Sequence, residues 1–420
     1  MKKLLSVTFF SALLTLCRMF SGFIVAKVVA VYIGPSGMSM LGQIQNVMTM
    51  LNGLVTSPAG NGVVRYTAQY NKDGYIACSP WWKASLKLIL LLLAIVTPLF
   101  AVFSRPLSAW LFLNPDYFWI ILLCLIALPF SAFGNLLISI INGQQLFKRF
   151  IIQSFISVLI SCAVMITFVV KLNVEGALIA VALQNGLIGT AIIIGSYKQS
   201  WFRWCHFWGG AEKEQYKALS GYILMAITTA LCTPIALIII RKIMVQHLGW
   251  DAAGQWQAVW KISETYLSVL TIALSTYYLP KLSAIDDSLL RKEVNKTALL
   301  FIPIATVLAM IVYFSKDIII TLLFTKDFSE ARGLFGIQLV GDVVKIASWL
   351  YAFPMLSRGM TKWFITTELI FSLTFVLLST LFINIYGLQG ANIAYLLNYV
   401  IYFCVMFFFL KPIKAINNNA

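Results

Sequence analysis

Residues 84–104 read ASLKLILLLLAIVTPLFAVFS, and Lys87 is their one charged residue. About 20 consecutive apolar residues form a helix long enough to cross the hydrocarbon core of a bilayer. Stretches of the same kind recur along the whole chain. They predict an all-α polytopic membrane protein with little of its mass outside the bilayer.

The composition agrees with this fold class. The 420 residues are 60% hydrophobic and 11% charged, with a mean hydropathy of +0.87, whereas soluble domains carry about 25% charged residues. A net charge of +16 would suggest nucleic-acid binding in a soluble protein. In a membrane protein Lys and Arg accumulate in cytoplasmic loops, so we expect membrane lipids and not nucleic acid as partners.

Twelve transmembrane helices are predicted. They cover approximately residues 4–33, 38–69, 84–104, 117–141, 151–170, 176–197, 219–241, 253–280, 298–315, 331–356, 363–383 and 390–410. The amino-terminal apolar run resembles a signal peptide, but it continues past Arg18 without a clear cleavage site, so we expect an uncleaved first helix. With the N-terminus inside, most Lys and Arg of the connections are cytoplasmic, which predicts that both termini are cytoplasmic. Arg241 and Lys242 then belong to an outer connection.

The chain repeats itself at about half its length. GQIQ at residues 42–45 recurs as GQWQ at 254–257, and Lys27 precedes Gly34 by the same spacing as Lys242 precedes Gly249. Six helices per half return the chain to its starting side, so the halves are expected to be parallel repeats around a central cavity. The predicted parts are an amino-terminal six-helix bundle at 1–197, a cytoplasmic linker at 198–218, a carboxyl-terminal six-helix bundle at 219–410 and a cytoplasmic tail at 411–420.

Six basic side chains fall inside apolar stretches: Arg18, Lys27, Arg65, Lys261, Arg332 and Lys345. A cation at the bilayer centre costs about 2.5–3.5 kcal/mol on insertion scales, and such residues usually face a watery cavity or a partner. The apolar stretches hold few acids to pair with them, which predicts a positively charged pocket for an anionic substrate. Arg18 lies near mid-membrane and favours the cavity. Lys27 and Arg65 have snorkelling to the nearer interface as an alternative, and Arg332 is expected to be an interface residue.

The predicted helix at 38–69 is rich in amides. Gln43 and Asn46 are candidates for binding sugar hydroxyls, because an amide has both donors and acceptors. Hydrogen bonding between helices is the alternative. Pro58 should break or bend this helix.

Residues 256–264 read WQAVWKISE. Trp256 and Trp260 lie four residues apart and form an aromatic stripe that suits carbohydrate rings, with an interfacial belt as the alternative. Lys261 is a candidate ligand for the substrate. It also lies three residues before Glu264, so the two side chains can pair on one helix face.

Residues 338–345 read QLVGDVVK, and they place Asp342 three residues before Lys345 near mid-membrane. A buried acid can change its protonation state, so Asp342 is a candidate for ion or proton coupling. A structural ion pair between Asp342 and Lys345 is the alternative. Glu368 is a weaker candidate near the inner face.

No pattern in the sequence indicates enzymatic chemistry. It contains no nucleotide-binding Gly loop, zinc motif or serine elbow. The seven Cys are scattered and the two His are far apart, so neither a disulfide framework nor a metal site is expected. We expect no cofactor, and transport would run on a proton or other ion gradient, the membrane potential or substrate supply.

Several of these stretches resemble the Wzx-type flippases of the multidrug/oligosaccharidyl-lipid/polysaccharide exporter superfamily. The resemblance covers the whole length and is most specific at IGPSG of residues 33–37, from 254–257 through YYLPKLS of 277–283, and at QLVGDVVK of 338–345. The carboxyl-terminal half is similar to flippases for enterobacterial common antigen. The amino-terminal half is more divergent, which suggests another glycan, such as an O antigen repeat unit.

The resemblance implies alternating access in the bacterial inner membrane. The implied substrate is undecaprenyl pyrophosphate carrying a short oligosaccharide, moved from the cytoplasmic to the periplasmic leaflet. Cations from helices 1, 2 and 8 would line the cavity, and Arg18, Arg65 and Lys261 occupy such helices. A polysaccharide polymerase and a chain-length regulator are the implied partners. The alternatives are the flippase for the common antigen lipid III, a multidrug exporter of the same superfamily, which would need acids in its cavity, and a membrane glycan polymerase, which would need a larger periplasmic loop.

Overall fold

In the computed structural model, residues 2–409 are described, and side chains are described from residue 13 onward except at 276, 280, 284, 287 and 409. The secondary structure of this part is helical and includes no strand, which confirms the all-α class. The predicted cytoplasmic tail at 411–420 lies outside the described residues.

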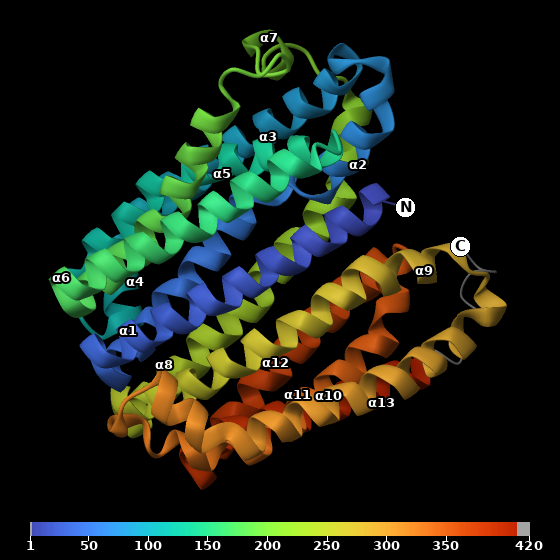
Figure 1. Cartoon of the computed structure of the whole chain (residues 1–420). Helices are drawn as coiled ribbons and strands as arrows, with labels where there is room; N and C mark the ends of the chain where they lie inside the picture. Colours follow the sequence, from blue (N-terminus) through green and yellow to red (C-terminus); the bar gives the residue numbers. More distant parts are fainter. Residues whose placement is uncertain (1, 410–420) are drawn as a thin grey trace. The chain divides into compact units, whose positions relative to one another are not determined.

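Nine helices of the described chain are long and apolar enough to cross a membrane (Figure 1). They are α1 (Lys2–Thr56), α3 (Tyr75–Val102), α5 (Phe118–Gly143), α6 (Phe147–Ser196), α8 (Lys213–Ala273), α10 (Asp287–Leu323), α11 (Ala331–Ser357), α12 (Thr361–Tyr386) and α13 (Leu388–Phe409). The shorter helices are α2 (Asn61–Tyr70), α4 (Ser104–Phe112), α7 (Trp204–Phe207) and α9 (Leu279–Ala284). The protein is therefore a multi-pass membrane protein.

Three of the long helices contain a kink at a residue with non-helical backbone. These residues are Gly34 in α1 (φ 62°), Asn173 in α6 (φ 50°) and Gly249 in α8 (φ 87°). Positive φ costs Gly little and is tolerated by Asn better than by most residues. All three lie in connections that the sequence predicts. Division of the three helices at these residues would give the predicted count of twelve, and the count itself stays a prediction.

Pro58 interrupts the second predicted helix, as expected. α1 ends at Thr56, a single 3₁₀ turn covers Ser57–Ala59, and α2 begins at Asn61. Proline cannot donate a backbone hydrogen bond and its ring crowds the preceding turn. The helix therefore restarts in a new direction at this point.

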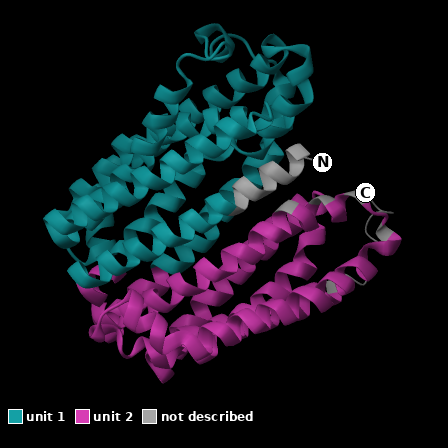
Figure 2. Cartoon of the chain, in the orientation of Figure 1, with its two compact units in different colours: residues 1–33, 40–238 teal, residues 34–39, 239–420 magenta. Residues whose placement is uncertain are grey.

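The chain divides into two compact units (Figure 2). Unit 1 comprises residues 1–33 and 40–238, and unit 2 comprises residues 34–39 and 239–420. In unit 1, α5 packs against α2, α3 and α6; in unit 2, α11 packs against α10 and α13, and α13 against α12. The unit boundary lies inside α8, and the segment 198–218 belongs to unit 1. The division into two six-helix bundles stays a prediction.

α5 and α6 approach closely because both present glycine. A Cβ atom on Gly134 would lie 2.5 Å from the Cα atom of Gly189. Small residues allow membrane helices to pack at short range, where van der Waals contact stabilises them. In unit 2 the buried core is aliphatic and aromatic, and the Tyr278 hydroxyl donates to the Leu350 carbonyl at 3.1 Å.

One expectation about the connections is wrong. α8 continues past Arg241 and Lys242 as far as the kink at Gly249, so both basic residues lie inside a helix and not in an outer connection. The run after them, Ile243-Met244-Val245, is apolar and largely buried. Its burial favours continuation of the helix beyond the two charges.

Candidate functional site

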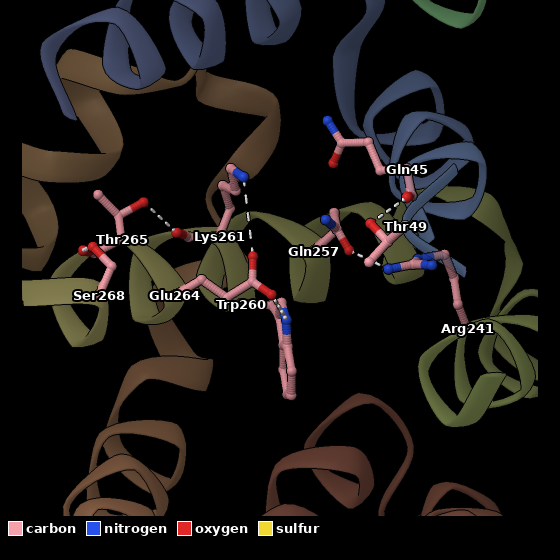
Figure 3. A network of polar contacts seen from close by, with 9 residues as sticks. All are labelled: Gln45, Thr49, Arg241, Gln257, Trp260, Lys261, Glu264, Thr265 and Ser268. Carbon is pink, nitrogen blue, oxygen red and sulfur yellow. Dashed lines mark hydrogen bonds and ion pairs between the residues drawn. The ribbon is translucent and has the colours of Figure 1, made fainter. Parts of the chain in front are cut away.

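α8 presents an acid, a base and an indole that contact one another (Figure 3). Lys261 Nζ lies 4.0 Å from Glu264 Oε2, and Trp260 Nε1 donates to the other carboxylate oxygen at 2.9 Å. The Lys261 and Glu264 side chains are 42% and 49% exposed. The predicted pair is therefore present at the limit of ion-pair distance, and both side chains are partly exposed.

Arg241 also lies on α8, before the kink at Gly249, and is 1% exposed. Its guanidinium donates to Oε1 of Gln257 and lies 5.7 Å from the ring centroid of Trp256 (Figure 3). Sequence reasoning missed this residue because it stood at the end of a predicted helix. The apolar run that follows it, and the amide in the repeated GQWQ, were the available signals.

Asp342 is fully buried on α11, with three donors around its carboxylate. Tyr266 and Tyr395 donate their hydroxyls to it at 2.7 and 2.8 Å, and Gln338 Nε2 donates at 3.2 Å. Buried charge is tolerated where hydrogen bonds replace its hydration. The carboxylate thus joins α11 to α8 and α13.

Lys345 is half-buried on the same helix, and its ammonium lies among four rings. Nζ is 5.8 Å from the centroid of Trp260, 4.9 Å from Trp349, 5.6 Å from Tyr395 and 5.4 Å from Tyr399. The quadrupole of an aromatic ring attracts a cation above its face. In the described part of the chain, Lys345 has no ion pair.

The partners of Asp342 and Lys345 therefore differ from the structural ion pair considered above. Spacing along α11 allows the pair, but tyrosines from α8 and α13 satisfy the carboxylate, and aromatic faces hold the ammonium. Tyr395 serves both, because its hydroxyl contacts Asp342 and its ring contacts Lys345. The roles of these residues in coupling stay predictions.

Unit 1 carries three of the six predicted cations. Arg18 is exposed and Lys27 half-buried on α1, and Arg65 is exposed on α2. The Arg65 guanidinium donates to the Tyr222 hydroxyl and lies 5.6 Å from the ring of Tyr66. Within the described residues, neither Arg18 nor Arg65 forms an ion pair with a carboxylate. No carboxylate of the described residues thus neutralises their charge.

One of the two candidate amides on α1 forms a hydrogen bond between helices, and sugar binding by either amide stays a prediction. Gln43 is buried, and its Nε2 donates to the Ile238 carbonyl at 3.3 Å, which is a contact between helices. Asn46 is half-buried on the same helix. Arg332 lies 3.4 Å from Asp317, and its place at the membrane interface stays a prediction. Across the described part of the chain, no group of three or more His, Cys, Asp and Glu could hold a metal ion.

The roles of these charged residues in binding a substrate stay predictions. The model of the polysaccharide biosynthesis protein family matches residues 83–332. The chain belongs to this family. Among curated proteins, this polysaccharide biosynthesis protein is 28% identical over 401 residues to the lipid III flippase of Escherichia coli K12, across 95% of this chain and 96% of the relative. The lipid III flippase of Shigella flexneri gives the same values.

Solved structures confirm the fold of this polysaccharide biosynthesis protein. An inward-facing multidrug resistance MATE family transporter of the MOP superfamily matches with a TM-score of 0.79 and 14% identity, over 97% of this chain and 96% of the other. A MOP superfamily transporter from Pyrococcus furiosus, described as having a binding pocket of reverse polarity, matches with a TM-score of 0.64 and 14% identity, over 96% of each chain. At this identity the likeness concerns the fold alone.

Proposed function

We propose that this polysaccharide biosynthesis protein is a flippase for undecaprenyl-pyrophosphate-linked oligosaccharides, with O antigen repeat units as its substrate. The observation that carries the proposal is a pair of exposed arginines, Arg18 on the apolar helix α1 and Arg65 on the short helix α2, neither with a carboxylate partner in the described chain. The chain belongs to the polysaccharide biosynthesis protein family, which supports a glycan-bearing molecule as the substrate that these cations bind.

The main energetic obstacle to translocation is the charge of the pyrophosphate headgroup. A pyrophosphate diester carries about two negative charges at neutral pH, and an isolated ion costs tens of kcal/mol in hydrocarbon by the Born estimate. Guanidinium groups present a planar fork that matches phosphate oxygens. Arg18 and Arg65, with Lys27 of the same unit as a further ligand, would replace the lost hydration while the polyprenyl tail stays in the bilayer. Lys261 of unit 2 stays a separate candidate ligand for the substrate.

The remaining parts of the proposal follow from the resemblance. The protein would act in the bacterial inner membrane by alternating access, with both termini cytoplasmic and without catalysing a chemical reaction. The proton gradient, the membrane potential or substrate supply would drive it. A polysaccharide polymerase and a chain-length regulator would receive the translocated unit.

The second candidate substrate is lipid III of enterobacterial common antigen. It is supported by the 28% identity to lipid III flippases over 95% of this chain. Deletion of the gene, with complementation by flippases of known glycan specificity, separates the two. Loss of O antigen alone supports the first substrate, and loss of common antigen alone supports the second.

A multidrug exporter shares the fold, but two arginines without a carboxylate partner in the described chain do not suit a cationic drug.

Translocation by the purified protein tests the proposal. In liposomes containing an undecaprenyl-pyrophosphate-linked repeat unit, a membrane-impermeant oxidant reports how fast the glycan changes leaflets. Loss of a charged hydrogen bond costs about 1.5–3 kcal/mol, so Arg18→Ala and Arg65→Ala should each slow translocation about tenfold or more, and Lys at either position should restore part of it. Lys316→Ala, which removes a cation beside Tyr313, is the control. Undiminished rates in both Ala variants would refute the assignment.

A further inference from the structure

We infer that unit 2 holds a separate subsite for an uncharged sugar ring of the transported glycan. We call it the glycan subsite and define it as Lys345, Trp349, Glu264, Glu368 and Tyr399. The inference rests on the proposed function and adds where the sugar, as distinct from the pyrophosphate, is bound.

The first step concerns the Lys345 ammonium. It has three N–H donors, yet in the described chain it forms neither a hydrogen bond nor an ion pair, and it lies 4.9–5.8 Å from the centroids of four rings. The rings fix the position of Nζ, but they do not accept hydrogen bonds as an oxygen atom does. The residue is half-buried, and the proposal places a ligand oxygen at these donors.

The second step concerns the acceptors. The carboxylates of Asp342, Glu264 and Glu368 all interact electrostatically with Lys345, and Glu264 accepts a hydrogen bond from Trp260, whose ring lies 5.8 Å from Lys345 Nζ. Glu264 is about half exposed and has one oxygen 4.0 Å from Lys261. Glu368 is half-buried and has no hydrogen bond among the described groups. A donor flanked by carboxylates matches hydroxyl groups, which both donate and accept, and would repel a phosphate.

The third step is the charge of the glycan subsite itself. It contains one cation, Lys345, and two carboxylates, Glu264 and Glu368. The subsite therefore has no positive surplus to stabilise two additional negative charges. An uncharged sugar meets no such penalty, whereas the unpaired Arg18 and Arg65 of unit 1 suit the pyrophosphate.

The fourth step is shape. Trp349 and Tyr399 are half-buried, so part of each ring is open to a ligand, while Trp260 and Tyr395 behind them are 6% and 1% exposed. The C–H face of a sugar ring packs on an aromatic face, and aromatic residues supply large contact areas at low conformational cost. All four rings lie near the Lys345 ammonium. The two half-buried rings, Trp349 and Tyr399, provide the surface on which the sugar would pack.

A comparison of two lipids tests the subsite. The full-length protein in nanodiscs is titrated with undecaprenyl pyrophosphate, and separately with the same lipid carrying the repeat-unit oligosaccharide. The variants are Lys345→Met and Glu368→Gln, with Lys345→Arg to restore the donors. Lys316→Met is the matched control, because Lys316 lies 4.2 Å from a single ring, that of Tyr313, outside the subsite.

We expect the wild-type protein to bind the glycan-bearing lipid more tightly than the bare lipid. Lys345→Met should weaken binding of the glycan-bearing lipid about tenfold and leave the bare lipid unchanged, with Lys345→Arg recovering part of the loss. An equal effect on both lipids, or no effect on either, would overturn the subsite. Equal wild-type affinity for the two lipids would overturn the subsite alone, whereas a wild-type protein that binds neither lipid would overturn the proposed function as well.

Discussion

Ser36 donates a hydrogen bond from its hydroxyl to Oδ1 of Asp251 at 2.6 Å, across 215 residues of sequence. Each partner lies two residues after a kink glycine, Gly34 or Gly249, and both glycines have positive φ. The glycines are separated by the same interval as the bonded pair. Equivalent positions of the repeat therefore contact each other within unit 2, which gives the repeat a structural counterpart.

Gly254→Ala should destabilise this contact. A Cβ atom there would lie 2.0 Å from the carbonyl oxygen of Pro35, so the backbone must move, and overpacking of this kind costs about 1–3 kcal/mol. We expect a lower midpoint of thermal unfolding in detergent. Gly333→Ala, with no atom within 4 Å of the added methyl group, should be neutral or slightly stabilising. A Gly254→Ala protein as stable as this control would show that the approach at Pro35 is not close.

Gly341→Ala should disturb the unit 2 site through Tyr395. The added Cβ would lie 2.5 Å from Cδ1 of that ring, and the ring bridges Asp342 and Lys345. We expect slower translocation and a smaller difference in affinity between the glycan-bearing and bare lipids. Gly336→Ala on the same helix meets only Tyr313 at 3.8 Å and serves as the control. Equal behaviour of the two variants would count against the bridging role of Tyr395.

Arg241→Ala should lower stability, because it leaves the Gln257 oxygen without its guanidinium donor in a buried setting. An unsatisfied buried group costs about 1–3 kcal/mol. Arg241→Lys should recover only part of this, since lysine lacks the planar fork. Thermal unfolding measures both. Arg105→Ala, which removes an exposed guanidinium 5.0 Å from the Phe118 ring, should change stability by less than about 0.5 kcal/mol. A comparable small change for Arg241→Ala would contradict the prediction.

Lys261→Ala should separate binding from stability. Its ion pair with Glu264 is long and half exposed, and such pairs contribute about 0–1 kcal/mol. We therefore expect almost unchanged thermal unfolding together with slower translocation. Lys261→Arg should retain most of the rate. If Lys261→Ala unfolded early and translocated normally when folded, its role would be structural.

Much of the architecture could be predicted from local sequence. Apolar runs long enough to cross a bilayer determine helices, and Pro58 determines an interruption, because these effects depend on residues a few positions apart. The same applies to the kinks at Gly34 and Gly249, where glycine tolerates positive φ. The contact between Lys261 and Glu264 also follows from helical spacing.

The tertiary structure decided the partners of the buried charges. Helical spacing placed Asp342 and Lys345 on one face of α11. It could not show that the hydroxyls of Tyr266 and Tyr395, from other helices, would donate hydrogen bonds to the Asp342 carboxylate. It likewise could not show that Arg241 would be buried against Gln257 and not lie in a connection. The reason is physical: a charge in a packed interior is stabilised by whatever donors, acceptors and ring faces lie nearest in space, and long-range packing determines which groups those are.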